Sequence, residues 1–427
     1  MAKKSIFCFS LCYLLFHFIS TVKSEQIRFI PYFRATWPHI DRNDIYDYAA
    51  TGIVWQSTWE VCFCGEDNRA GRIVGDSIYW WTLRPSGEGF LKEDPVVPNS
   101  QDDMKEDGRH SCAPTIIKHS NPYIENGKEF YKMYYECARR FYDKDSGNIV
   151  EGFTQICHAV SEDGVNWKKF NRELWETEHR YGDLNTPPTP VITVNSRILQ
   201  NCQYEFSNGK HKILSSCMND GGNYGVGHPS AIVRRIGGGQ QIWLYYYDSS
   251  GDWSQRRVYL AKSWDGFNFE TPIPTNLTNP VDVKYFALPT SEHDGYFVAT
   301  QGLYNDNYFA YSFDGINWVW YENVIDKDRL KIGKAVEAHQ IAYAQPAILS
   351  DKFGILNTSY VNILSGEGAA EINGVPVPWW RTAGLWLIQG KFLGMKFLLS
   401  KYFTTDNEAD LNADAKVNSI DFGMMTK

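Results

Sequence analysis

The sequence predicts an all-β fold, a five-bladed β-propeller with a short C-terminal calcium-binding segment, and three observations lead to it. A turn phrase recurs in register, as SEDGVNW at 161–167, SWDGFNF at 263–269 and SFDGINW at 312–318. A strand-like run rich in β-branched and aromatic residues precedes each copy. Aromatic residues make up 15% of the 427-residue chain, as expected for twisted sheets joined by many turns.

The turn phrase sets the repeat length. Its Asp-Gly pair and its Asn are residue types that tolerate positive φ, and its last residue is an aromatic that re-enters a sheet. The copies begin 102 and then 49 residues apart (263 − 161 and 312 − 263), so a period of about 50 fits both gaps. A period in this range is typical of propeller blades and other repeat arrays.

Three or four antiparallel strands per repeat give five blades within residues 40–395. We expect them at 47–90, 110–170, 227–269, 283–320 and 337–392.

Residues 171–224 do not fit the repeat. Their TPPTP run at 186–190 and two cysteines indicate a loop or lid. A sixth, divergent blade is the alternative.

The N-terminus predicts export. Lys3 and Lys4 precede an apolar run at 6–19, and small residues precede a cut near Glu25, so residues 1–24 read as a signal peptide. The apolar run is shorter than the ~20 residues that a membrane span needs. We therefore expect a secreted, extracellular protein without a membrane anchor.

The charges exclude two classes of partner. The formal net charge is −8, without clusters of Lys or Arg, so neither nucleic acid nor an anionic membrane surface is an expected partner.

Two of the nine cysteines leave with the signal peptide. Of the remaining seven, some should pair after export, and the odd count leaves at least one unpaired or intermolecular. Cys62 and Cys64 lack the spacing of a zinc site.

The five-unit pattern, its Asp-Gly-x-Asn-Trp turns and the phrase YGVGHPSA at 224–231 resemble the five-bladed glycoside hydrolases around family 43. The resemblance covers roughly residues 40–395. It implies hydrolysis of polysaccharides or oligosaccharides by an arabinosidase-, xylosidase- or fructosidase-like enzyme, with no cofactor in catalysis. Such hydrolysis needs two carboxyl groups across the scissile bond, one protonated and one ionised.

The innermost strands of a propeller surround its axis, so polar residues at the starts of these strands converge on one funnel. This position selects candidates from all five units, and Glu136, at the end of a second strand, can also reach the funnel. The candidates are Asp47, Asp107, Arg109, His110, Glu136, His228, Asp282, Glu337 and His339.

The resemblance implies that Asp47 is the general base. We expect Glu337 or Glu136 to be the acid, and Asp282 or Asp107 to tune the pKa of the acid.

The remaining candidates are expected to bind substrate. They are Arg109, His110, His228 and His339, with Trp55 to stack on a sugar face.

One departure from the resembling family concerns Ala113, which precedes Pro114 where relatives often carry an acid. A non-catalytic carbohydrate-binding propeller is therefore the alternative function. An interaction scaffold whose funnel is plugged by residues 171–224 is a third.

The C-terminal stretch 410–421 has the spacing of an EF-hand calcium loop, which takes oxygen ligands at positions 1, 3, 5, 7, 9 and 12. The predicted ligands are Asp410, Asn412, Asp414, Lys416 through its carbonyl, Asn418 and Asp421. The pattern resembles one repeat of a bacterial dockerin over 404–427, which implies attachment to a cohesin-type scaffold protein. Ala415 stands where a glycine is usual, and an acidic solvated tail is the alternative.

Overall fold

The computed structural model describes most of the chain between residues 28 and 393. The described residues are 28–35, 47–55, 58–67, 75–84, 89–102, 104–120, 127–150, 153–214, 216, 225–250, 256–288, 291–303, 306–320, 325–326, 341–356, 360–369, 371–372, 375–376 and 384–393. They are mostly β, as the sequence predicts.

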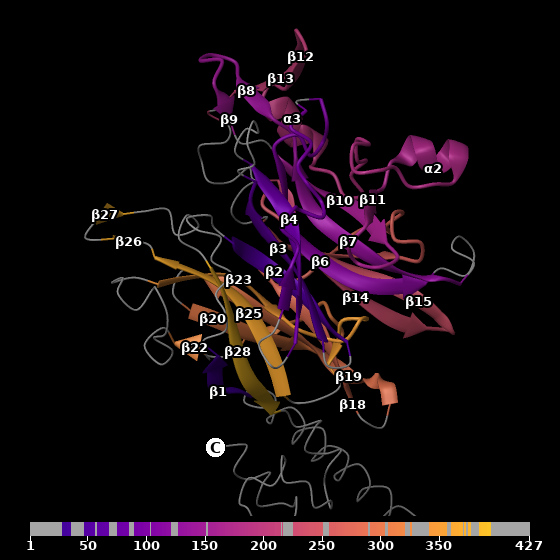
Figure 1. Ribbon diagram of the computed structural model, residues 1–427, viewed down its shortest axis with the longest axis vertical. Coiled ribbons are helices and arrows are strands. Elements are labelled where there is room, and N and C mark those ends of the chain that lie inside the picture. Colours follow the sequence, from indigo (N-terminus) through magenta and orange to yellow (C-terminus); the bar gives the residue numbers. More distant parts are fainter. Residues whose placement is uncertain are drawn as a thin grey trace, which may run out of the picture.

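Within these residues the chain forms five four-stranded antiparallel ladders, here called units 1 to 5 (Figure 1). Unit 1 holds β2 (Asp47–Trp55), β3 (Thr58–Glu66), β4 (Asp76–Leu83) and β5 (Gly89–Leu91). Unit 2 holds β6 (His110–Ser120), β7 (Glu129–Ala138), β10 (Thr154–Ser161) and β11 (Trp167–Lys169). Unit 3 holds β14 (Val226–Ile236), β15 (Gly239–Asp248), β16 (Arg257–Ser263) and β17 (Ile273–Pro274).

The last two units complete the set. Unit 4 holds β18 (Asp282–Leu288), β19 (Ser291–Leu303), β20 (Asp306–Ser312) and β21 (Val319–Trp320). Unit 5 holds β23 (Ile341–Ile348), β25 (Tyr360–Ala369), β28 (Gly384–Leu393) and, from the other end of the sequence, β1 (Arg28–Ala35). The N-terminal strand β1 pairs antiparallel with β28 and so ties the two ends of the described chain together.

The first strands of the five units form a closed circle. They contact one another in the order β2, β6, β14, β18, β23 and back to β2. Apolar clusters fill the spaces between neighbouring units. For example, Trp80 of unit 1 packs with Tyr131 of unit 2, and Tyr245 of unit 3 packs with Tyr285 of unit 4. In units 1 to 4 the central strands bury described residues on both faces, because neighbouring units cover both sides of each ladder.

The three turn phrases follow β10, β16 and β20, as the sequence predicts, and share one hydrogen-bond pattern. In the first copy, the Gly164 N–H donates to Ser161 Oγ at 2.9 Å, and the Asn166 N–H donates to Asp163 Oδ1 at 2.8 Å. The glycines of the three copies have φ of 82°, 93° and 76°. The asparagines do not have positive φ; their side chains instead donate to the aspartate of the same copy.

Each turn phrase also docks on the preceding unit. The carbonyl of Gly266, in unit 3, accepts a hydrogen bond from the Tyr134 hydroxyl of unit 2 at 2.8 Å. The carbonyl of Gly315, in unit 4, accepts one from the Tyr245 hydroxyl of unit 3 at 3.1 Å. The recurring glycine therefore serves the contact between units as well as the turn.

Gly164→Ala is expected to lower the free energy of unfolding by about 2–4 kcal/mol. An added Cβ would lie 2.6 Å from the Trp80 ring, and φ is +82°. Gly147→Ala is the matched control, because φ is +71° there but nothing lies within 4 Å of the added Cβ. Urea denaturation of both variants measures the difference, and equal losses would show that the Trp80 contact contributes nothing.

The described part of 171–224 contains no further four-stranded unit, so no sixth blade lies in it. It holds α2 (Arg172–Glu178), α3 (Ser196–Asn201), β12 (Glu205–Ser207) and β13 (Lys210–Ile213). The strand β13 pairs with β8 (Phe141–Asp143), which pairs with β9 (Ile149–Val150). This small sheet lies at the top of Figure 1, away from β1 and β28 at the bottom. The 102-residue gap between the first two turn phrases is therefore an insertion between consecutive units.

The remaining short strands extend the ladders or stand apart. They are β22 (Ile325–Asp326), β24 (Ile355–Leu356), β26 (Glu371–Ile372) and β27 (Val375–Pro376). Among the described helices, none has the length and apolar character to cross a membrane.

Disulfides join strands near the circle of first strands. Cys64 of β3 is bonded to Cys112 of β6, and Cys137 of β7 is bonded to Cys157 of β10. Cys202 is also disulfide-bonded, whereas Cys62 is buried and free. One free cysteine agrees with the odd count in the sequence.

Candidate functional site

A hollow lies where the first strands of the five units meet. All five units contribute to its lining. The lining residues are Ala49, Ala50, Thr51, Ala113, Pro114, His228, Pro229, Pro280, Val281, Asp282, Thr300, Pro346 and Ala347. His228 and Asp282 are the ionisable side chains among them.

The lining is built from the same backbone irregularity in several units. The ladders of β2, β6 and β14 shift register between Tyr48 and Thr51, between Cys112 and Thr115, and between Gly227 and Ser230. At each register shift, the backbone of one residue adopts a left-handed conformation with positive φ. These residues are Ala49 (φ 50°), Ala113 (φ 41°) and His228 (φ 48°).

A non-glycine residue in this conformation costs about 1–2 kcal/mol, and such residues gather at functional sites. The Ala113 position noted in the sequence thus faces the hollow, and unit 1 also presents an alanine there.

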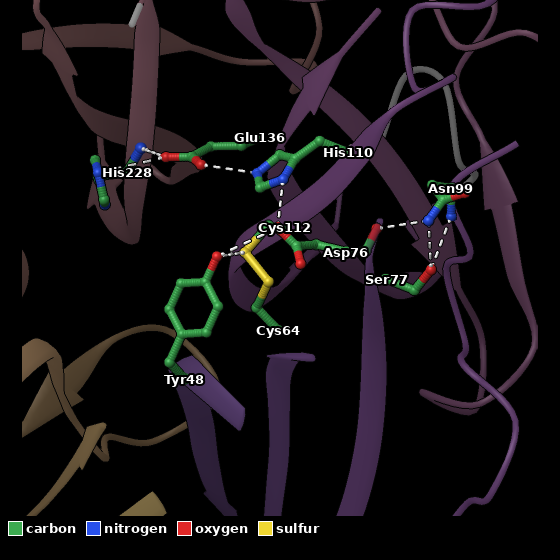
Figure 2. The surroundings of a disulfide bond; sticks show 9 residues. All are labelled: Tyr48, Cys64, Asp76, Ser77, Asn99, His110, Cys112, Glu136 and His228. Carbon is green, nitrogen blue, oxygen red and sulfur yellow. Dashed lines mark hydrogen bonds and ion pairs between the residues drawn. A yellow bond between two sulfur atoms is a disulfide. The ribbon is translucent and has the colours of Figure 1, made fainter. Parts of the chain in front are cut away.

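Behind His228 lies a buried carboxylate, that of Glu136 (Figure 2). Its Oε1 accepts the backbone N–H of His228 at 2.5 Å and lies 3.7 Å from Nε2 of the His228 ring. Its Oε2 lies 3.3 Å from Nε2 of His110. Gly227 allows this approach, since a Cβ there would lie 2.4 Å from Glu136 Oε1. Both carboxylate oxygens are therefore engaged, and Glu136 does not line the hollow itself but contacts His228, which does.

His110 bridges two acids. Its Nδ1 lies 2.7 Å from Asp76 Oδ2 at the start of β4, opposite the contact with Glu136. Asp76 Oδ2 also accepts a hydrogen bond from the Tyr48 hydroxyl at 3.3 Å, beside the disulfide between Cys64 and Cys112 (Figure 2). Sequence reasoning missed Asp76 and Tyr48. Asp76 begins a strand, but this is the third strand of its unit, whereas the prediction drew mainly on the starts of first strands.

These contacts set the charges of the cluster. Burial opposes ionisation of Glu136, but His228 and His110 outweigh burial and lower the pKa of Glu136 to about 2. Burial also opposes protonation of His110, but its bonds to Asp76 and Glu136 raise its pKa to about 10. Burial lowers the pKa of His228, against the attraction of Glu136. At neutral pH the cluster thus holds an ionised Glu136, a protonated His110 and a neutral His228.

The cluster predicts how stability depends on pH. The pKa of His110 is raised from 6.5 to about 10, so its contribution is complete below pH 6.5 and is lost as pH rises toward 10. The pKa of Glu136 is lowered from 4.5, so its contribution is lost only as pH falls from 4.5 toward 2. The free energy of unfolding should therefore fall between pH 6.5 and 10.

Urea denaturation at several pH values checks this expectation. His110→Gln should remove most of the slope between pH 6.5 and 10. A wild-type protein equally stable at pH 6.5 and pH 9.5 would rule out the charged bridge.

Asp282 lies at the hollow with both its carboxylate oxygens hydrogen-bonded. Its Oδ1 accepts from Ser230 Oγ at 2.8 Å and from Lys284 Nζ at 2.5 Å, and its Oδ2 accepts from the Ile348 N–H at 2.7 Å. It therefore joins the first strands of units 3, 4 and 5. A tuning role, as the sequence suggested, fits this position better than direct proton transfer.

Asp107 and Arg109 do not line the hollow. Asp107 is fully buried and its Oδ2 lies 2.5 Å from Nζ of the equally buried Lys169. The backbone N–H of Arg109 donates to the Ala138 carbonyl at 2.9 Å, and its guanidinium packs near Gly75. A residue just before a first strand is not carried to the axis unless the chain turns inward there.

Other predicted residues are placed only in part or not at all. Asp47 and Trp55 begin and end β2, and their backbones pair with Gly65 and Thr58. The others lie outside the described residues. They are Glu337, His339 and the predicted calcium ligands Asp410, Asn412, Asp414, Lys416, Asn418 and Asp421.

One group in the described part of the chain has metal-ligand spacing, that of Cys64, Asp76 and Cys112. Both sulfur atoms are joined in a disulfide, so no thiolate is offered there.

Comparisons with known proteins give structural likeness alone. No family model matches the chain, and no curated protein sequence matches it. A family 62 glycoside hydrolase solved with xylotriose overlaps with a TM-score of 0.48 and 9% identity, covering 86% of this chain and 98% of its own. The α-L-arabinofuranosidase of Podospora anserina, solved with cellotriose, overlaps with a TM-score of 0.48 and 12% identity, covering 87% of this chain and 98% of its own. A family 117 glycoside hydrolase of Zobellia galactanivorans overlaps with a TM-score of 0.46 and 13% identity, covering 87% of this chain and 91% of its own.

Proposed function

We propose that this protein is a secreted glycoside hydrolase with a five-bladed propeller fold, acting on polysaccharide or oligosaccharide at the axial hollow. One observation carries the proposal: the carboxylate of the buried Glu136 accepts the backbone N–H of His228 at the hollow. A buried charge is costly to maintain, so one that orients a cleft residue is a functional-site candidate.

The chemistry divides among a few groups. His228 binds a sugar hydroxyl, and the carboxylate of Asp282 tunes the pKa of the general acid. Because its pKa is about 2, Glu136 is unsuited to the acid role considered from the sequence, which leaves Glu337 for that role. Asp47 remains the proposed general base, which takes a proton from the attacking water.

Secretion is part of the proposal. The disulfides of Cys64, Cys137 and Cys202 support it, because such bonds persist in oxidising compartments. The dockerin-like tail, with calcium and a cohesin-type partner, stays a separate proposal that rests on residues 404–427 alone.

A carbohydrate-binding propeller without turnover is the second candidate. It is favoured by Ala49 and Ala113, which put methyl groups at bulge positions facing the hollow.

A direct test separates the two functions. The purified full chain is incubated with arabinoxylan, arabinan, fructan and their oligosaccharides, and products are followed by mass spectrometry while calorimetry measures binding. Release of shorter sugars from any of these substrates supports the hydrolase. Tight binding with intact oligosaccharide after several days would reject it and favour the binding propeller.

A further inference from the structure

A second hollow lies on the small sheet of β8, β9, β12 and β13, which Figure 1 shows away from β1 and β28. Three lysines from two chain segments line it: Lys144 just after β8, and Lys210 and Lys212 on β13. We call this hollow the lysine site. Neither the hydrolase proposal nor the calcium tail uses it.

Strand geometry brings the lysines together. Lys210 and Lys212 alternate with the buried His211 and Ile213, so both lysines point to the open face of β13. The parallel pairing of β13 with β8 sets Lys212 beside Tyr142. Nζ of Lys210 lies 4.2 Å from the centroid of the Tyr142 ring. The Tyr142 ring therefore packs against the Lys210 ammonium group at the hollow.

Two acids offset part of this positive charge. Glu205 lies 2.9 Å from Lys144 Nζ and, as the cross-strand partner of Lys212, also attracts that lysine. Asp143 lines the hollow, but its Oδ1 accepts the backbone N–H groups of Asp145 and Ser146 in its own turn. Within the described residues, neither Lys210 nor Lys212 forms an ion pair.

This local excess of positive charge stands in a chain whose formal net charge is −8. Cations kept close together on an acidic protein repel one another, and a bound anion relieves that repulsion.

We propose that the lysine site binds the anionic group of an acidic polysaccharide, a carboxylate or a sulfate ester. The anionic group follows from the three lysines, and the polysaccharide rests on the proposed function. The site then serves as an accessory subsite that holds a charged chain while another part of that chain reaches the axial hollow.

The test uses the full chain and four probes: polygalacturonate, dextran sulfate, neutral arabinoxylan and inorganic sulfate. Affinity electrophoresis and calorimetry are run at low and high salt. Lys210→Glu with Lys212→Glu should weaken binding to at least one acidic polymer tenfold or more. Lys128→Glu with Lys168→Glu, at two other outward-facing lysines, makes the same change in net charge and should have less than a twofold effect.

The outcomes are separable. Preference for polygalacturonate identifies a carboxylate, and preference for dextran sulfate identifies a sulfate ester. Equal losses in both double variants, or wild-type binding to arabinoxylan as tight as to both acidic polymers, would overturn the lysine site. Lysine-dependent binding without hydrolysis by the wild type would overturn only the proposed function, whereas hydrolysis without such binding would overturn only the lysine site.

Discussion

Glu136→Gln is expected to lower kcat/KM about 100-fold, because a buried group left without its charged partner costs about 1–3 kcal/mol. Glutamine keeps the volume and one acceptor but not the charge that holds the neutral ring of His228 and the protonated ring of His110. Glu162→Gln, at an exposed carboxylate paired with Lys128, is the matched control and should change kcat/KM less than twofold.

A double-mutant cycle shows whether Glu136 acts through His228. If it does, Glu136→Gln adds little to the loss already caused by His228→Ala, since the two changes remove one function. Fully additive losses would assign Glu136 a role independent of His228. The pH profile gives a second readout, because Glu136→Gln should also reduce the loss of stability between pH 6.5 and 10 that is expected of the wild type.

The second large effect concerns stability. Asp107→Asn is expected to lower the free energy of unfolding by about 3–5 kcal/mol, because it leaves the buried Lys169 without its counter-charge. Any kcat measured for the folded protein should not change, since Asp107 does not line the hollow. Asp102→Asn, at a carboxylate that is 44% exposed, is the control and should cost under about 0.5 kcal/mol.

Replacing both partners separates a missing charge from missing packing. Asp107→Leu combined with Lys169→Met should recover most of the stability that Asp107→Asn loses, because two apolar side chains leave no unpaired charge. A loss of kcat in folded Asp107→Asn would return Asp107 to the catalytic role considered from the sequence.

The repeating part of the fold could be predicted from local sequence. Ser161, Asp163 and Gly164 and their counterparts make the same short-range hydrogen bonds in every copy, so the phrase marks the third strand of a unit wherever it occurs. The pairing of β1 with β28 could not be predicted, because it joins residues at opposite ends of the chain and leaves no local pattern.

The candidate site was predictable only in part, for a similar reason. Position at a strand start selected His110, His228 and Asp282, which do lie at or beside the hollow. The same criterion selected Asp107, because sequence position does not say whether a side chain turns toward the axis or toward Lys169. Tyr48 and Asp76 were missed because their partners come from a different unit or a different strand.

The small residues at the hollow are visible in the sequence, but their backbone conformation could not be predicted from it. Ala113 is visible in the sequence, whereas its left-handed backbone and the equivalent position of Ala49 emerge only from the register shifts of the ladders.

The central claim is that carboxylates at the starts of first strands act together at the axial hollow. The most direct measurement compares hydrolysis by the wild type, Asp47→Ala and Glu337→Ala on the best substrate of the panel, with folding checked by circular dichroism. We predict a fall of about a thousand-fold or more in each variant. Rates equal to the wild type in both folded variants would contradict the claim.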